Sequence, residues 1–246
     1  MTKEKLQWVY GRKPIREALQ AGESVDRIYA LASLKKEGLP ELRALAKSHG
    51  VPIHWVPAER LNRLVKGNHQ GVAAQVSLIR YYDIQDVIAQ TFEKGEVPLI
   101  LLLDHITDVR NLGAIARTAY GAGAHAIVVP AKGTASINED AIKTSAGALH
   151  HLSVCRHHSL VELIQQLQQY GIAVYALAGE APLPMSAVDA KGPCAFILGA
   201  EETGVSTPLR FACDEEIALP MQRPFDSYNV SVAAGMVLYE VMRQRQ

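Results

Sequence analysis

The stretch Leu99-Ile100-Leu101-Leu102-Leu103 is an unbroken apolar run with no polar alternation. Such a run is typical of a strand that is covered on both faces, as in a parallel sheet. Later segments repeat the pattern at 126–129, 173–178, 195–198 and 216–219. Helical patterns between several of them predict helices over 112–122, 138–148, 160–170 and 230–243. We therefore expect an α/β fold with a parallel sheet flanked by helices, which binds ligands at the carboxyl ends of its strands.

The chain before Pro98 has a different organisation. Its pattern predicts strands over 9–11, 27–33, 51–56 and 71–79, and helices over 12–20, 39–49 and 58–65. We interpret residues 1–79 as a small α/β domain, near the lower size limit for independent folding. Residues 80–97 are interpreted as a linker, within which 84–92 could form a helix. Residues 98–246 are then the second, larger domain.

Charge is distributed unevenly along the chain although the formal net charge is zero. Residues 1–82 hold 14 Lys and Arg against 7 Asp and Glu, whereas the rest of the chain holds 11 against 18. A basic front indicates nucleic acid as a possible partner. The alternative is that these cations only solvate a surface, and the charge balance alone leaves both interpretations open.

Composition excludes several classes of protein. With 48% hydrophobic residues, the chain can bury a sizeable core. No apolar run is long enough to cross a bilayer, and no secretory signal follows Met1. The three cysteines, Cys155, Cys194 and Cys213, are scattered and odd in number, which argues against a disulfide framework. We expect a cytoplasmic protein with no membrane partner.

The loop after the first predicted strand of the second domain carries polar residues that could do chemistry. Asn111 stands where it could cap the following helix. Arg117 falls outside the apolar stripe of that helix, and periodicity alone favours a plain surface role for it.

Two further loops share this character. Gly199 and Gly204 bracket Glu201 and Glu202 where the chain leaves a predicted strand. Glycines there allow either an ordinary turn or a close approach of backbone to a ligand. Before the last helix, Ser227 and Asn229 could each act as a cap, as a catalytic group, or as both.

Other active-site signatures are absent or weak. The sequence has no dinucleotide-binding glycine loop in the right context, no phosphate-binding P-loop and no serine-hydrolase elbow. A histidine and cysteine cluster gives a zinc hydrolase as an alternative; its members are His150, His151, Cys155, His157 and His158. Their spacing matches no structural zinc pattern, so we expect no metal site.

The three loops together resemble the SpoU family of RNA ribose 2′-O-methyltransferases, also called TrmH, within the SPOUT superfamily. The matching residues are Asn111-Leu112-Gly113-Ala114-Ile115, Arg117, Leu198-Gly199-Ala200-Glu201, Gly204, Leu219-Pro220-Met221, Ser227, Asn229-Val230-Ser231 and Ala233. The front also resembles the RNA substrate-binding domain of that family, which is similar to ribosomal protein L30e. Its marks are Tyr10-Gly11, Glu17-Ala18-Leu19 and His69-Gln70-Gly71-Val72-Ala73.

This resemblance implies an α/β-knot fold, with the C-terminal segment threaded as a deep trefoil knot, and S-adenosylmethionine as cofactor. It implies cofactor contacts from Gly199, Leu219, Met221 and Tyr228. It implies catalytic or orienting roles for Asn111, Arg117, Glu201, Ser227 and Asn229. We expect Arg117 to bind phosphate and stabilise the developing alkoxide, because a guanidinium is a poor base. Glu201 is expected to hold Arg117 or its own loop.

The resemblance also implies a homodimer and an RNA substrate. It points to a guanosine of 23S rRNA, with a tRNA ribose or a non-catalytic RNA-binding role as alternatives. Two positions depart from the family pattern. Val109 stands where a proline is frequent, which should leave its loop less preset, and Tyr228 stands where leucine is common.

Overall fold

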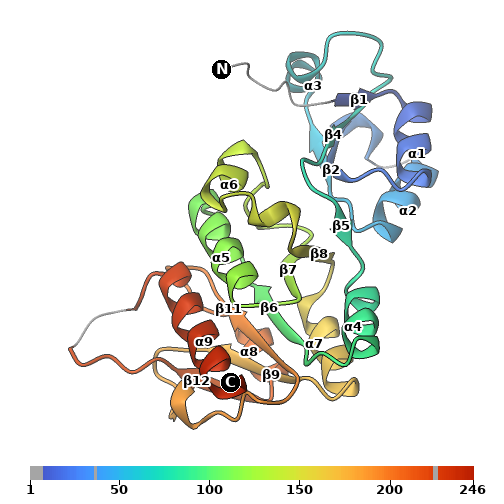
Figure 1. The fold of residues 1–246 in the computed structure, drawn as a ribbon. Helices are drawn as coiled ribbons and strands as arrows, with labels where there is room; N and C mark the ends of the chain where they lie inside the picture. The colour runs from blue at the N-terminus through green and yellow to red at the C-terminus, as the bar shows by residue number, and fades with distance from the viewer. Residues whose placement is uncertain (1–7, 36–37, 224–226) are drawn as a thin grey trace. The chain divides into compact units, whose positions relative to one another are not determined.

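The computed structural model describes residues 8–35, 38–223 and 227–246 (Figure 1). The chain divides into two compact units, Met1–Arg80 and Tyr81–Gln246. Each unit has its own sheet and its own buried core. Within the described ranges, no helix combines the length and the hydropathy that a membrane crossing requires.

The first unit is a four-stranded mixed sheet with helices on both faces. Its elements are β1 (Trp8–Tyr10), α1 (Arg12–Gln20), β2 (Val25–Leu31), a 3₁₀ turn (Ala32–Leu34), α2 (Pro40–Ser48), β3 (Ile53–Val56), α3 (Ala58–Leu64) and β4 (Val72–Val76). The strand order is β1-β4-β2-β3. Ile15 of α1 and Leu42 of α2 pack on one face of the sheet, while Leu61 of α3 packs on the other.

The second unit holds an eight-stranded sheet. Its elements are β5 (Tyr81–Tyr82), α4 (Ile84–Glu93), β6 (Leu99–Leu103), α5 (Val109–Gly121), β7 (Ala126–Pro130), α6 (Glu139–Thr144), a 3₁₀ turn (Ala148–His150), β8 (Ser153–His157), α7 (Leu160–Gln169), β9 (Ala173–Leu177), β10 (Leu183–Pro184), a 3₁₀ turn (Met185–Ala187), β11 (Cys194–Leu198), α8 (Thr207–Ala212), β12 (Glu215–Ala218) and α9 (Val230–Arg245). The strand order is β10-β12-β9-β11-β6-β7-β8-β5, and every neighbouring pair is parallel. The predicted parallel sheet is confirmed.

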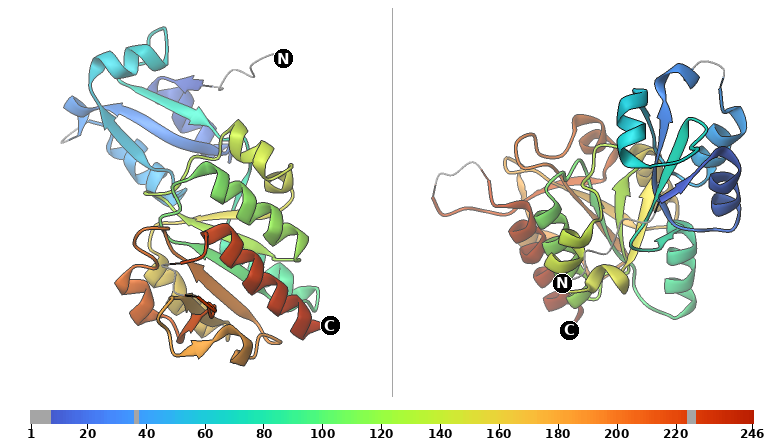
Figure 2. Two further views of the ribbon diagram at one scale, coloured as in Figure 1. Left: turned by 90° about the vertical axis from the view of Figure 1, so that its left-hand side faces the viewer. Right: turned by 90° about the horizontal axis from the view of Figure 1, so that it is seen from above.

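Strand β6 lies in the middle of this sheet, between β11 and β7. All of its residues are buried, as its uninterrupted apolar run predicts. Ile100 and Leu102 join the core formed with α4 and α7. Because side chains alternate along a strand, the other residues of β6 face the opposite side, where Figure 2 shows α5 and α9 lying side by side.

The structure differs from the sequence prediction at three places in this unit. Segment 80–97, interpreted as a linker, contains the helix that the sequence allowed there, α4, and also β5, and Ile84 packs in the core of the second unit. Helix α5 begins at Val109, and its cap is Asp108, whose carboxylate accepts from the Arg110 amide, so Asn111 lies in the first turn instead. The helix predicted over 138–148 ends at Thr144, where Ala146 and Gly147 both take positive φ.

Gly113 allows α5 to pack closely against α6. A Cβ at this position would lie 2.7 Å from Thr144 Cβ and 2.9 Å from the Ala141 carbonyl oxygen. We expect Gly113→Ala to lower the free energy of unfolding by about 1–3 kcal/mol, as overpacking does. Gly121, the last residue of the same helix, has open space around its Cβ position. Urea denaturation should therefore show Gly121→Ala as stable as the wild type, and equal midpoints for both variants would contradict this account.

Candidate active site

A pocket opens at the carboxyl ends of β9, β11 and β12, where a parallel sheet is expected to bind its ligand. Its volume is about 330 Å³, within the range of small-molecule sites. The lining residues are 177–180, 198–205, Arg210, Ile217, Leu219, Met221, Ser227, Tyr228, Val230 and Ala233. Six predicted site residues thus meet in one place: Gly199, Glu201, Leu219, Met221, Ser227 and Tyr228.

The loop after β11 forms one wall of this pocket. It folds back on itself, because the Gly204 amide donates to the Ala200 carbonyl at 2.8 Å. A Cβ on Gly199 would overlap the backbone of Gly204 and Val205. Only glycine therefore fits at the start of this loop. The sequence singled out Gly199 for contact with a ligand, and the structure adds that the loop itself requires it.

A chain of hydrogen bonds joins all three motif loops beside the pocket. Asn111 Nδ2 donates to Glu201 Oε1, and Asn229 Nδ2 donates to Asn111 Oδ1 at 3.2 Å. Asn229 Oδ1 in turn accepts from the Ser231 amide at 3.0 Å and from the Ser231 hydroxyl at 2.6 Å. Asn229 is therefore the cap of α9, as the sequence allowed.

The direction of this chain follows from its two ends. A carboxylate only accepts hydrogen bonds, so Asn111 must turn its amide nitrogen toward Glu201. A backbone amide only donates, so Asn229 must turn its oxygen toward Ser231. Each asparagine thus has one permitted orientation, and the network holds both amides fixed at the rim of the pocket.

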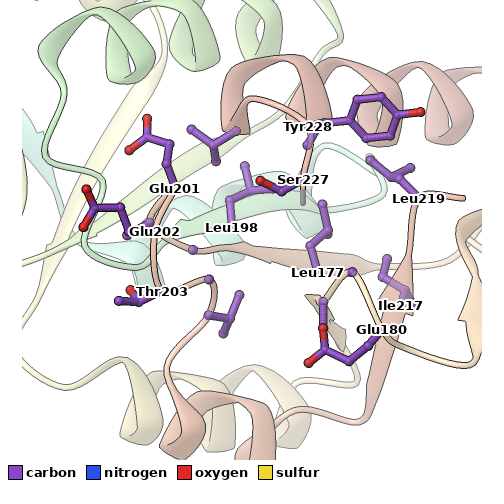
Figure 3. Close-up of a pocket in the computed structure, with 18 of the residues that line it drawn as sticks. Leu177, Glu180, Leu198, Glu201, Glu202, Thr203, Ile217, Leu219, Ser227 and Tyr228 are labelled. Atoms are coloured by element: carbon purple, nitrogen blue, oxygen red, sulfur yellow. The ribbon is translucent and has the colours of Figure 1, made fainter. Parts of the chain in front are cut away.

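Residues after β12 form the facing wall. In Figure 3, Ser227 lies between Leu198 and the end of the last strand, whereas the ring of Tyr228 points away from Glu201 and Glu202. The Tyr228 hydroxyl donates to the Pro220 carbonyl at 3.4 Å. This hydrogen bond holds the Tyr228 side chain, and Tyr228 is one of the residues that line the pocket.

The loop after β9 also lines the pocket, although the sequence did not predict any of its residues as site residues. Arg210 donates to Glu180 at 3.0 Å and to Glu216 at 2.6 Å. Hydrogen bonds from the backbone amide of Glu180 and from Arg210 lower the pKa of Glu180. The rule that placed Gly199 at a strand end also applies to Ala178 and Gly179, which follow β9, so the signal was present in the sequence.

Arg117 stands apart from the network. It is exposed on α5 and makes no hydrogen bond or ion pair with residues in the part of the chain that the structure describes. The sequence predicted that Glu201 holds either Arg117 or its own loop, and in the structure Glu201 accepts a hydrogen bond from Asn111. Within the described part of one chain, Arg117 therefore makes no hydrogen bond to this network.

The histidine and cysteine cluster does not form a metal site in the described ranges. No group of three or more histidine, cysteine, aspartate or glutamate side chains there could hold an ion. Burial raises the pKa of Cys155 to about 12, because its apolar surroundings disfavour the thiolate. His157 Nδ1 contacts the Ser159 carbonyl oxygen at 2.7 Å, and His158 pairs with Glu162. The zinc-hydrolase alternative has no ligand set among these residues.

Comparison with known families matches both units. Residues 98–239 match the SpoU rRNA methylase family, and residues 8–82 match the RNA 2′-O ribose methyltransferase substrate-binding family. The chain is 34% identical over 238 residues to YacO of Bacillus subtilis, whose name places it in the TrmH family of tRNA/rRNA methyltransferases. This match covers 97% of the chain and 96% of YacO.

Solved structures of methyltransferases share this fold. The SpoU methyltransferase AviRb of Streptomyces viridochromogenes, in complex with S-adenosylmethionine, matches with a TM-score of 0.62 and 24% identity, over 97% of this chain and 90% of that one. An RNA 2′-O ribose methyltransferase matches with a TM-score of 0.56 and 26% identity, over 97% and 88%.

The pocket suits S-adenosylmethionine on chemical grounds. This cofactor carries a sulfonium and an ammonium group, and the pocket presents Glu180, Glu201 and Glu202 against a single guanidinium, that of Arg210. Leucine, isoleucine and valine side chains supply apolar contacts of the kind an adenine ring needs. Fold and site thus define a methyltransferase that uses S-adenosylmethionine. The chain belongs to the SpoU rRNA methylase family.

Proposed function

We propose that this protein methylates the 2′-hydroxyl of an RNA ribose, and that its target is a guanosine of 23S rRNA. The observation that carries the reaction is the hydrogen-bonded chain from Glu201 through Asn111 to Asn229. It fixes polar groups from three separate loops at the rim of a pocket that suits the cofactor. We place the cofactor contacts at Gly199, Leu219, Met221 and Tyr228.

Bound S-adenosylmethionine supplies an electrophilic methyl group. The chain's contribution is positional, because a hydroxyl held in line with that group reacts at a high effective concentration. Asn111 and Asn229 are the groups to orient the ribose, since both amides are locked by their neighbours. Ser227 lines the pocket and completes this set.

Arg117 has the role of binding the RNA phosphate and stabilising the negative charge that develops on the ribose oxygen as its proton passes to solvent. A guanidinium suits this because it keeps its charge and matches phosphate with two parallel hydrogen bonds. The exposed position of Arg117 is compatible with a group that engages only when RNA is present.

The RNA is proposed to be recognised by the first unit and presented to the second. Support comes from the substrate-binding family match over residues 8–82 and from the excess of cations before residue 83. The assignment to 23S rRNA rests on a resemblance of both units to bacterial RlmB, the member of the family that methylates a guanosine ribose of 23S rRNA. Such a substrate implies action in the cytoplasm.

The test is methyl transfer from radiolabelled S-adenosylmethionine to unmodified transcripts of 23S rRNA and of tRNA, assayed separately. Label in 23S rRNA is the expected result. Label in tRNA alone would retain the reaction but refute the substrate. No label in either, or in ribosomal precursor particles, would refute the enzymatic function and favour a protein that only binds RNA.

Two features of the family fold are proposed together with this function. The first is the trefoil knot, with the C-terminal segment threaded through a loop; Leu219, Met221, Ser227 and Tyr228 of that segment line the same pocket as the loop 199–205. The second is a homodimer formed through α9. Its outer face exposes an apolar stripe at helical spacing, made of Val232, Met236, Tyr239 and Met242. Tyr120 of the neighbouring α5 is also half exposed, and Arg117 lies one turn from it.

Charge placed in this stripe should dissociate the dimer. We expect Tyr239→Glu to sediment as a monomer, because an unpaired carboxylate would be buried at the interface. Phe211 on α8 is 86% exposed and outside the stripe, so Phe211→Glu serves as the matched control and should sediment as a dimer. Sedimentation velocity would contradict the assignment if Tyr239→Glu remained dimeric or if the wild type were already monomeric.

A further inference from the structure

Asp104 and His105 form a polar pair at the carboxyl edge of the sheet, directly after β6 and outside the residues that line the pocket. Asp104 directly follows β6 and is only 2% exposed. Both of its carboxylate oxygens are engaged: Oδ1 lies 2.6 Å from His105 Nδ1, and Oδ2 accepts from the Ser206 amide at 2.8 Å. The buried carboxylate thus connects the imidazole to the loop that walls the pocket.

The backbone around His105 is held in an uncommon conformation. His105 has a φ of 57°, a region that residues with a Cβ seldom occupy. Its ring lies against Gly133, where an added Cβ would come within 2.6 Å of His105 Cδ2. The next residue, Ile106, accepts through its carbonyl from the Ala135 amide at 2.8 Å. Strain of this kind concentrates at functional positions and needs firm surroundings, which these contacts supply.

The hydrogen bond to Asp104 determines which ring nitrogen can serve a ligand. Because a carboxylate only accepts, Nδ1 carries the proton and Nε2 keeps its lone pair in the neutral imidazole. Nε2 has no hydrogen-bond partner among residues 8–35, 38–223 and 227–246, and the side chain is 59% exposed. In its neutral form, His105 therefore presents Nε2 toward solvent as a hydrogen-bond acceptor.

His105 lies at a part of the carboxyl edge of the sheet that the pocket does not occupy. The pocket occupies the ends of β9, β11 and β12, whereas His105 and Gly133 follow β6 and β7. The loop from Asp104 to Asn111 is tied to the pocket wall at both ends, through Ser206 and Glu201. A transfer reaction needs its second substrate next to the first, and this segment borders the pocket wall, so we expect the RNA to approach over it.

We propose that His105 is a substrate-binding residue whose Nε2 accepts a hydrogen bond from an O–H or N–H group of the target nucleotide or its immediate neighbour. Asp104 acts through it as a positioning residue, by holding Nδ1. Lys132, which precedes Gly133, is exposed and has no ion-pair partner in the described part of the chain, so it can meet an adjacent phosphate. This inference rests on the proposed function for the identity of the substrate as RNA.

His105→Asn tests the inference and separates it from a structural role. Asparagine tolerates positive φ and offers a δ nitrogen to Asp104, but it has nothing at the ε position. We expect the full-length variant to keep the melting temperature and the dissociation constant for S-adenosylmethionine of the wild type. Its KM for the unmodified 23S rRNA transcript should rise about tenfold with little change in kcat, as loss of one binding contact does.

Two outcomes would overturn the inference. Unchanged KM and unchanged RNA affinity in His105→Asn would show that the imidazole only satisfies Asp104. Parallel weakening of RNA and cofactor binding would show that it only supports the loop. Should the wild type transfer no methyl group to any RNA, the proposed function would fail. The RNA dissociation constants of the two proteins, measured by filter binding, would still decide the role of His105.

Discussion

Arg117→Ala is expected to lower kcat by about 100- to 1,000-fold, as removal of a group that stabilises developing negative charge does. Binding of S-adenosylmethionine should stay within about twofold of the wild type, because Arg117 neither lines the pocket nor belongs to the hydrogen-bonded chain. Single-turnover methylation of RNA and calorimetric titration with the cofactor measure the two quantities separately. Arg117→Lys should recover little activity, since an ammonium cannot grip phosphate with two parallel bonds.

The matched control for this variant is Lys94→Ala. Lys94 is an exposed cation of the same unit, but it follows α4 and so lies near the amino ends of the strands, away from the site. Its removal should leave kcat and RNA binding unchanged. An Arg117→Ala variant that lost cofactor binding and turnover equally would contradict the role assigned to Arg117.

Gly199→Ala is expected to weaken cofactor binding about 100-fold, equivalent to about 2.7 kcal/mol. The added methyl group would overlap the backbone of Gly204 and Val205, and a backbone cannot rotate aside as a side chain can. The loop 199–205 must therefore open, which displaces the wall of the pocket and separates Glu201 from Asn111. The free energy of unfolding should fall by about 1–3 kcal/mol at the same time.

Gly192 offers the control, because it stands just before β11 as Gly199 stands just after it. A Cβ at Gly192 meets nothing within 4 Å. Gly192→Ala should bind the cofactor and unfold as the wild type does. Wild-type cofactor affinity in Gly199→Ala would show that the wall of the pocket does not depend on this glycine.

The sequence predicted the sheet and its edge well, because burial on both faces leaves a plain signature. The apolar run of β6 indicated a central parallel strand, and the strand ends then indicated where Glu201 and Ser227 would meet. The roles of these residues as catalytic groups stay predictions.

Short elements escaped detection because they carry too few residues for a periodic pattern. Strands β5 and β10 each have two residues. The only sequence signals for helix α8 are Ser206 and Pro208 near its start. The start of α5 was misplaced because Asp108 and Asn111 are both good capping residues. Tertiary contact with Glu201 removes Asn111 from that role.

The hydrogen-bonded chain and the Asp104–His105 pair could not be derived from sequence. Asn111 and Asn229 are 118 residues apart, and nothing local encodes their contact. The His105 ring lies against Gly133, a contact between distant residues that only the packed structure defines.

The proposed reaction methylates a ribose oxygen and not a base. The most direct measurement is the position of the methyl group in RNA labelled by the purified protein, read after complete alkaline hydrolysis. A 2′-O-methyl group blocks alkaline cleavage of the adjacent phosphodiester. We therefore expect the label to be recovered in an alkali-resistant dinucleotide that contains guanosine. Label recovered in a mononucleotide would place the methyl group on a base and contradict the account.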